Sequence, residues 1–286
     1  MQRRDLLQGL GLTIAGALGG IRMASAAQSG PADAFKGRPP SSPLGIQLFS
    51  LRNILATDFE GTLAQVAKIG YREVEFVGLF NRPAKQVRVI LDRQGLTSPS
   101  GHTSLQGVTD TLDRTLADAQ ALGQQYVIVP WLAAEFQSLD GFRRAAEVLN
   151  RAGERIRAAG LRLGYHNHAF EFQRVGLGSM GYDLLLRYTD PELVCMELDL
   201  YWIRRGGQDP ADYFRRHPER FHLVHVKDMA RDGAMVDVGR GTTRWPELLG
   251  TARRAGVRHF LVEHDNPPDP MAFARASYRY LSALPV

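Results

Sequence analysis

The sequence is poor in cysteine, and this scarcity excludes two kinds of chemistry. Cys195 is the only cysteine among the 286 residues, so the chain forms no intramolecular disulfide and carries no dithiol redox pair. Hydrophobic residues make up 44% of the chain, enough to build a large apolar core. We therefore expect neither a disulfide-stapled scaffold nor a thiol oxidoreductase.

Long apolar runs and strong net charge are also missing. The apolar run from Leu10 to Ile21 is rich in glycine and shorter than the roughly 20 residues that span a bilayer. The net charge of the whole chain is only +5, too small to indicate a nucleic-acid partner. The sequence therefore favours a protein that acts on small molecules, and it is compatible with a homo-oligomer.

The N-terminus has the features of an export signal. Arg3 and Arg4 precede the apolar run, and a small-residue cleavage site at Ala24–Ala26 follows it. We predict a twin-arginine-type signal over residues 1–27, a linker or arm over residues 28–42, and a periplasmic protein that does not contact the membrane after cleavage. An ordinary secretory signal with two chance arginines is the alternative.

From residue 43 to residue 286, short apolar or β-branched runs alternate with helical patterns, which is typical of repeated βα units. Several of the predicted helices end at a glycine, as at Gly95 and Gly123. The predicted strands are 45–50, 73–77, 97–102, 126–130, 162–167, 194–199, 222–227 and 260–264.

Eight parallel strands can form either a closed barrel or an open doubly wound sheet. No glycine-rich phosphate loop directly follows one of these strands, which argues against the open sheet and against phosphorylated substrates. We predict an α/β fold, a (β/α)₈ TIM barrel. In such barrels the active site is built at the C-terminal ends of the strands.

Four consecutive predicted strands end in polar residues. Alternation along a strand places the two members of each polar pair on one side. The pairs are His166 with His168, Glu197 with Asp199, and His225 with Lys227, joined by Glu263. A single such histidine is more often a hydrogen-bonded core residue. Several buried carboxylates, in contrast, need a cation or hydrogen-bond partners to offset their desolvation.

Carboxylates together with imidazoles are a donor set for a divalent metal ion. The oxygen-rich character favours Mn²⁺, with Mg²⁺, Zn²⁺, Fe²⁺ and Co²⁺ as alternatives. The sequence therefore predicts a metal centre at one end of the barrel.

Six segments of the sequence resemble the sugar isomerase/epimerase family, which has a xylose-isomerase-like barrel. They are Gly45–Arg52, Tyr71–Glu75, Tyr165–His168, Glu197–Trp202, His225–Asp228 and Val262–His264. The resemblance extends from about residue 43 to the C-terminus. It implies a metal held by residues at the ends of the last four strands, with Asp199, His225 and Glu263 on three of the four ligand positions.

The fourth ligand position departs from the family pattern. His166 stands where the resemblance places a glutamate that binds metal and moves a proton, which puts a two-glutamate epimerisation mechanism in doubt. We predict that His166 is the fourth ligand. Glu171 and Glu197 are the alternatives.

Further polar and aromatic residues are expected to line the substrate pocket. Glu75 and His102 match polar pocket positions of the family, and Glu197 is a further candidate. Aromatic faces suit the C–H surface of a sugar ring, which nominates Trp131 and Trp202, although simple packing is the alternative.

Two residues are expected to take part in proton transfer beside Glu263. Lys227 is a candidate electrophile for a substrate oxygen, with a salt bridge to Asp228 or to an acid of the sixth predicted strand as the alternative. His168 is the principal candidate base, because an ordinary imidazole accepts a proton near neutral pH.

This constellation predicts abstraction of a proton next to a metal-polarised carbonyl. Reprotonation of the enediolate elsewhere would make the protein an isomerase or epimerase of an unphosphorylated sugar or keto-sugar, which the resemblance places first. Expulsion of a β-leaving group would make it a lyase that cleaves 3-keto-glycosides. A non-catalytic periplasmic sugar-binding protein and a metal-dependent endonuclease are alternatives from other classes. The small net charge disfavours the endonuclease.

Overall fold

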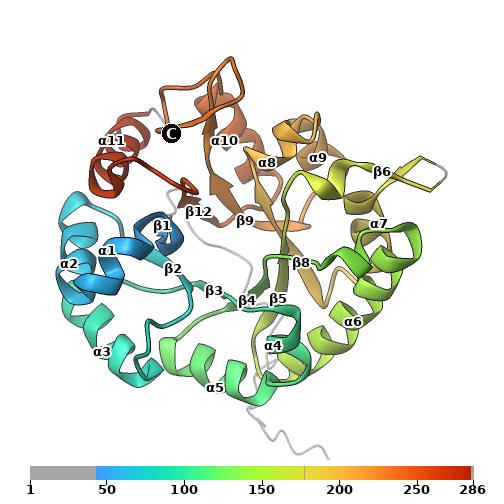
Figure 1. Ribbon diagram of the computed structural model, residues 1–286, viewed down its shortest axis with the longest axis horizontal. Helices are drawn as coiled ribbons and strands as arrows, with labels where there is room; N and C mark the ends of the chain where they lie inside the picture. The colour runs from blue at the N-terminus through green and yellow to red at the C-terminus, as the bar shows by residue number, and fades with distance from the viewer. Residues whose placement is uncertain (1–42, 177, 285–286) are drawn as a thin grey trace, which may run out of the picture. The chain divides into compact units, whose positions relative to one another are not determined.

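The computed structural model describes residues 43–176 and 178–284. Within this part of the chain, eight parallel strands close into a barrel, and helices surround it (Figure 1). The barrel strands follow one another in chain order. Their numbers have gaps because two hairpins between them contain the strands β6, β7, β10 and β11. The eight barrel strands are β1 (Leu44–Gln47), β2 (Glu73–Val77), β3 (Ser100–His102), β4 (Tyr126–Val129), β5 (Arg162–His166), β8 (Val194–Asp199), β9 (Phe221–Val226) and β12 (His259–Val262). The predicted (β/α)₈ barrel is thus confirmed.

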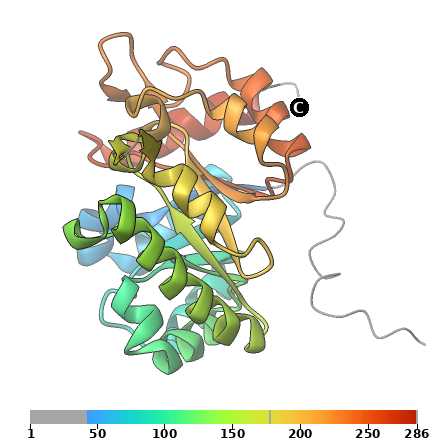
Figure 2. The ribbon, with the colours of Figure 1, turned by 90° about the vertical axis from the view of Figure 1, so that its right-hand side faces the viewer.

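The helices pack their apolar sides against the outside of the barrel. Figure 2 shows the ribbon from the side. They are α1 (Arg52–Thr57), α2 (Phe59–Ile69), α3 (Ala84–Gln94), α4 (Leu105–Thr109), α5 (Leu112–Leu122), α6 (Leu139–Ala158), α7 (Gly181–Tyr188), α8 (Trp202–Arg205), α9 (Pro210–Arg216), α10 (Trp245–Arg254) and α11 (Pro270–Ser282). Among the described residues, none of these is long and apolar enough to cross a membrane.

Shorter elements connect the barrel units. They are the 3₁₀ turns η2 (Leu48–Leu51), η3 (Ala134–Phe136) and η4 (Phe170–Phe172), and the hairpins of β6 (Arg174–Val175) with β7 (Ser179–Met180) and of β10 (Asp228–Met229) with β11 (Met235–Val236). The predicted signal (1–27) and linker (28–42) lie outside the described residues.

Helix ends follow the glycine pattern of the sequence. Gly95 and Gly123 end α3 and α5 in the left-handed conformation, with φ of +65° and +71°. Ser138 begins α6 by accepting a hydrogen bond from the Gly141 N–H, which satisfies one of the free donors of the first turn. Local sequence therefore determines where each unit turns back toward the barrel.

Two strands depart from the predicted bounds by three residues at one end. The first ends at Gln47, because the Gln47 side chain accepts a hydrogen bond from the Phe49 N–H and turns the chain into η2. The third begins only at Ser100. Thr97 forms an isolated bridge with Glu73, and Pro99, which has no N–H, interrupts the ladder.

Gly176, Gly178 and Gly181 form a glycine pattern outside the barrel strands. Its spacing matches the dinucleotide fingerprint, but it follows the two-residue strand β6 and not a barrel strand. Gly176 and Gly178 flank the hairpin turn with positive φ, and a Cβ on Gly181 would lie 2.2 Å from Phe142. These glycines therefore have a structural explanation.

Candidate active site and metal centre

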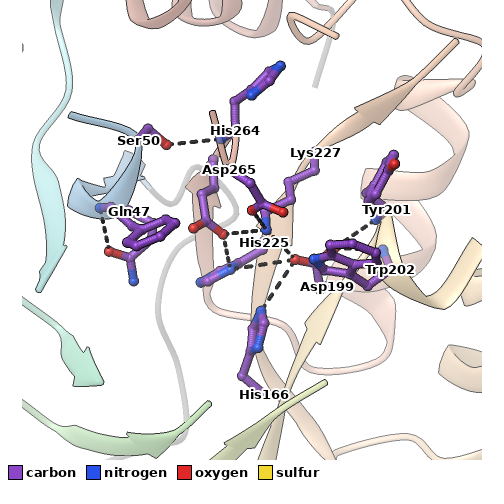
Figure 3. Close-up of polar contacts among 12 residues, drawn as sticks. Gln47, Ser50, His166, Asp199, Tyr201, Trp202, His225, Lys227, His264 and Asp265 are labelled. Carbon is purple, nitrogen blue, oxygen red and sulfur yellow. Dashed lines mark hydrogen bonds and ion pairs between the residues drawn. The ribbon is translucent and has the colours of Figure 1, made fainter. Parts of the chain in front are cut away.

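Four side chains converge at the C-terminal ends of β5, β8, β9 and β12. His166, Asp199, His225 and Glu263 each offer one nitrogen or oxygen, and these four atoms lie within 4.8 Å of one another. Figure 3 shows His166, Asp199 and His225 directed at one another. The structure thus brings together all four residues that the sequence nominates as ligands.

Asp199 is oriented by the backbone around it. Its Oδ1 accepts hydrogen bonds from the N–H groups of Tyr201 and Trp202, each at 2.9 Å. Its own N–H donates to Asn167 Oδ1 at 3.0 Å. Oδ2 is left to face the cluster, where it lies 3.3 Å from His166 Nε2.

Lys227 extends its ammonium group among the carboxylates of the cluster. Its Nζ lies 2.9 Å from Asp199 Oδ2, 2.7 Å from Glu263 Oε2 and 2.6 Å from Asp265 Oδ1. Burial alone would lower the pKa of Lys227, but these carboxylates outweigh it and raise the pKa above its usual value. Lys227 therefore remains protonated at neutral pH and is a cation, not a base.

Asp228 does not pair with Lys227, although the two are adjacent in sequence. Its carboxylate accepts hydrogen bonds from the N–H groups of Gly239 and Gly241 and from Trp245 Nε1. Asp228 thus organises the loop that follows β9. Of the two salt bridges considered for Lys227, only the one to an acid of the sixth barrel strand, Asp199, is present.

Three of the four candidate ligands are in the protonation states that a cation requires. The fourth is His225, where Glu197 and Glu263 outweigh burial and raise the pKa well above its usual value, so its ring gives up a proton when it binds a cation. Burial and the neighbouring His225 lower the pKa of His166 to about 3, so its imidazole is neutral. Burial by itself would raise the pKa values of Asp199 and Glu263, but the Lys227 ammonium outweighs it and holds both carboxylates ionised.

Two atoms of the cluster test whether a cation would fit there. His225 Nδ1 and Glu263 Oε2 are buried and lie 2.7 Å apart without a well-aligned hydrogen bond between them, and the Lys227 ammonium lies 2.7 Å from the same oxygen. A cation already approaches this oxygen, and the nitrogen and oxygen atoms of the four candidate ligands face one point, which fits a bound metal ion. The donor set of two imidazoles and two carboxylates suits a divalent ion.

Beneath this cluster lies a second layer of buried acid and imidazole groups. It contains Glu75, His102, Glu197 and His225, whose nearest nitrogen and oxygen atoms are also within 4.8 Å of one another. His102 Nε2 lies 2.9 Å from Glu197 Oε2 and 3.2 Å from Glu75 Oε1. His225 belongs to both layers.

Charges in the lower layer support each other. Burial would lower the pKa of His102, but Glu75 and Glu197 raise it to about 9, so this imidazole is protonated at neutral pH. Burial would raise the pKa of Glu75, but His102 and His225 hold it well below its usual range. Both glutamates are completely buried and face His102 and His225, and their predicted contact with substrate stays a prediction.

His168 lies at the mouth of the site between two tryptophans. Its ring centroid is 5.0 Å from that of His166, 4.8 Å from Trp131 and 5.5 Å from Trp202. Trp131 is half exposed, at 50%. The Nδ1 of His168 is buried without a hydrogen bond to any described residue.

The acidity of His168 differs from the expectation of an ordinary imidazole. Burial lowers its pKa to about 4, with the attraction of Asp199 opposing this and the Lys227 charge reinforcing it. The ring is therefore neutral at pH 7 and can accept a proton, but it is a weaker base than the sequence suggests.

Glu171 has a role other than metal binding. Its carboxyl group accepts hydrogen bonds from the Tyr165 hydroxyl at 2.8 Å and from the His168 N–H at 2.9 Å. Burial raises the pKa of Glu171 to about 8, in spite of these bonds. Neither of the two described groups of candidate ligands contains Glu171, and Glu197 belongs to the lower layer, so the geometry favours His166 as the fourth ligand.

Sequence reasoning missed two residues that touch this centre. Gln47 donates a hydrogen bond from Nε2 to Glu75 Oε1 at 2.6 Å, and Asp265 contacts Lys227. Gln47 lies within the segment that carries the family resemblance, and Asp265 follows Glu263 by two residues. Both therefore gave a signal, but neither could be assigned a partner from the sequence.

Comparison with known proteins gives this geometry a family. The model for the xylose isomerase-like TIM barrel matches residues 63–284. An inosose dehydratase from Lacticaseibacillus casei is 25% identical over 271 residues, which cover 79% of this chain and 89% of the relative.

Two crystal structures, each described as a sugar phosphate isomerase/epimerase from Parabacteroides distasonis ATCC 8503, are also similar. They are 27% and 26% identical, with TM-scores of 0.77 and 0.78, and the matches cover 87% and 86% of this chain and 96% and 99% of theirs. The family model covers most of the barrel, and the chain belongs to the xylose isomerase-like TIM barrel family.

Proposed function

We propose that this protein is a divalent-metal-dependent lyase that eliminates a β-leaving group from an unphosphorylated keto-sugar, keto-cyclitol or 3-keto-glycoside. The observation that carries the proposal is the convergence of His166, Asp199, His225 and Glu263 within 4.8 Å at the strand ends. Mn²⁺ is the first candidate ion, and Fe²⁺, Co²⁺, Zn²⁺ and Mg²⁺ are alternatives.

Elimination needs a base, a stabilised negative charge and a proton for the leaving group. His168 takes the proton from the carbon next to the carbonyl, and the C–H electrons form the enediolate. His166, Asp199, His225 and Glu263 would hold a divalent ion, which when bound would supply the Lewis acidity that makes this C–H acidic. The electrons then form the C=C bond as the β C–O bond breaks, and the departing oxygen takes a proton from the Lys227 ammonium or from water.

Two features favour elimination over epimerisation. Epimerisation requires acid and base groups on opposite faces of one carbon, and His166 replaces the glutamate that would supply the second group. The Lacticaseibacillus casei relative is a dehydratase by name, that is, an enzyme that eliminates water.

Isomerisation or epimerisation of an unphosphorylated sugar is the second candidate. The names of the two Parabacteroides distasonis structures favour it, and Glu263 would then act as a base beside His168. In either reaction Trp131 and Trp202, which flank His168, are proposed to stack on the sugar, and His102 to contact it at the edge of the lower layer.

A panel assay in D₂O separates these reactions. Metal content is measured first, and the metal-loaded protein is then incubated with ketoses, keto-cyclitols and 3-keto-glycosides. Formation of an unsaturated ketone with release of the leaving group supports the lyase. A deuterated epimer or isomer with no released group supports the second candidate. Sugar binding without metal, turnover or exchange would mean a non-catalytic binding protein and would contradict both.

We further propose that the protein is exported to the periplasm by the Arg3–Arg4 pair. Changing both residues to Lys should leave the precursor inside the cell, because the twin-arginine pathway reads the arginines themselves. Fractionation and immunoblotting of both forms measure this. An unchanged periplasmic yield would show that the pair is only a basic region of an ordinary signal.

A further inference from the structure

His225 connects the two layers of the site through its two ring nitrogens. Its Nδ1 lies 2.7 Å from Glu263 Oε2 and 3.8 Å from Asp199 Oδ2, both in the upper cluster. Its Nε2 lies 2.7 Å from Glu75 Oε1 and 3.3 Å from Glu197 Oε2, both in the lower layer. One ring thus has carboxylates at either edge.

We infer that Glu75 is a positioning residue that fixes the tautomer and orientation of His225, so that Nδ1 is the nitrogen offered to the cation. The inference rests on the proposed metal-dependent function. A carboxylate can only accept a hydrogen bond, so the nitrogen that faces Glu75 must carry the proton. The other nitrogen, Nδ1, faces Glu263 and Asp199, and a cation bound between them would take the place of the Nδ1 proton and use its lone pair.

Glu75 is itself held rigidly. Its carboxylate is completely buried, and its Oε1 accepts from Gln47 Nε2 at 2.6 Å as well as from His225. The Gln47 amide is oriented in turn, because its Oε1 accepts from the Phe49 N–H. A chain of hydrogen bonds therefore leads from the turn after β1 to the candidate ligand on β9.

Glu197 has a weaker claim to this role. Its Oε2 lies closer to His102 Nε2, at 2.9 Å, than to His225 Nε2, at 3.3 Å. His102 lies between both glutamates and balances their charge, while Glu75 makes the shorter contact with His225. The inference therefore concerns Glu75 first.

The chain offers a matched control on the same strand. Glu73 lies two residues before Glu75 on β2, is also buried, and has its Oε2 2.9 Å from His259 Nδ1. Glu73→Gln and Glu75→Gln each neutralise a buried carboxylate next to an imidazole. Only the imidazole beside Glu75 is a candidate metal ligand.

The test is a Co²⁺ titration of metal-free wild type, Glu75→Gln and Glu73→Gln, followed by visible absorption and by competition with a chelator. Urea unfolding of the metal-free proteins measures their stability in parallel. Glu75→Gln should bind Co²⁺ roughly 10- to 100-fold more weakly, as expected when the partner of a ligating histidine is removed. Glu73→Gln should lie within about twofold of wild type even where its stability falls equally.

Several outcomes would overturn the inference. Wild-type affinity in Glu75→Gln, or an equal loss in Glu73→Gln, would remove the positioning role while leaving the metal site intact. Two Co²⁺ ions per chain would mean that the lower layer binds a cation itself. A wild type that binds no Co²⁺ would remove both the metal site and the role of Glu75.

A second measurement needs no variant and covers the case in which Glu75→Gln does not fold. Nitrogen-15 NMR of histidine-labelled, Zn²⁺-loaded wild type reports which nitrogen of each ligating ring is bound to metal. His225, assigned by comparison with His225→Gln, should be bound through Nδ1 with a proton on Nε2. Binding through Nε2 would overturn the inference, and neither result depends on turnover of any sugar.

Discussion

Both ends of the barrel bury histidine and glutamate side chains, but one end is a packed core and the other is the candidate metal centre. At the N-terminal end, Glu73 pairs with His259, and the edge of Tyr126 packs against His222 and His259 at centroid distances of 5.7 and 5.6 Å. Burial, followed by the charge of Arg258, lowers the pKa of His222 to about 2, so that ring is neutral. This end is a packed core that contains polar groups.

The C-terminal end contains more buried carboxylates than nearby cationic side chains. Asp199, Glu263 and Asp265 surround the single ammonium of Lys227. Buried histidine and glutamate are therefore not in themselves a site. The excess of carboxylates distinguishes the two ends.

The strongest test of this contrast removes the candidate ligands. Replacing Asp199, His225 or Glu263 by Ala should abolish stoichiometric metal, because each residue supplies one atom of the four-atom cluster. Plasma mass spectrometry of protein loaded with Mn²⁺ or Co²⁺ measures it. His259→Ala, at the other end, should keep its metal. Full occupancy in all three ligand variants would erase the distinction between the ends.

A smaller effect is expected where the site meets its substrate. His168→Gln should keep the metal while kcat falls by about 10²-fold, because a general base is lost. Exchange of the substrate C–H with solvent deuterium should fall in parallel. His222→Gln makes the same replacement at the N-terminal end and should change kcat little. If His168→Gln exchanges deuterium at the wild-type rate, Glu263 becomes the first candidate for the base.

The smallest effect concerns Glu171, whose buried carboxyl group should make the free energy of unfolding depend on pH. The folded-state pKa of Glu171, about 8, lies above the ordinary value of 4.5. The unfolded chain therefore loses this proton first, and stability falls as pH rises from about 4.5 to 8. Urea unfolding of metal-free protein at pH 5 and pH 8 should show a loss on the order of 3 kcal/mol in wild type beyond that in Glu171→Gln. Equal losses in both proteins would mean that Glu171 is ionised in the folded state.

Sequence periodicity could predict that polar side chains of four neighbouring strands meet, because that meeting follows from strand register. His166, Asp199, His225 and Glu263 occupy the last or second-last positions of neighbouring strands or the residue just beyond them. In a closed parallel barrel these positions meet at one rim. The choice of these four as ligands came from the family resemblance, because alternation alone does not distinguish Asp199 from Glu197.

Depth along the barrel axis could not be predicted in the same way. Glu75 and Glu197 have the same inward register as the pocket residues, yet both are completely buried below them. The shear of a barrel staggers its strands, so equal distance from a strand end does not mean equal height. Their pairing with His102 and His225 could not be read from the sequence, and their contact with substrate stays a prediction.

The sequence by itself determined the barrel, the end at which polar residues gather and the residues that meet there, because alternation and glycine-terminated helices are local properties. Only the tertiary structure decided that Lys227 lies among three carboxylates, that His225 faces Glu75 with one nitrogen and Glu263 with the other, and that burial makes His168 a weak base. Hydrogen-bond partners and desolvation depend on distances between residues far apart in the chain, such as the 150 positions between Glu75 and His225. No local pattern encodes those distances.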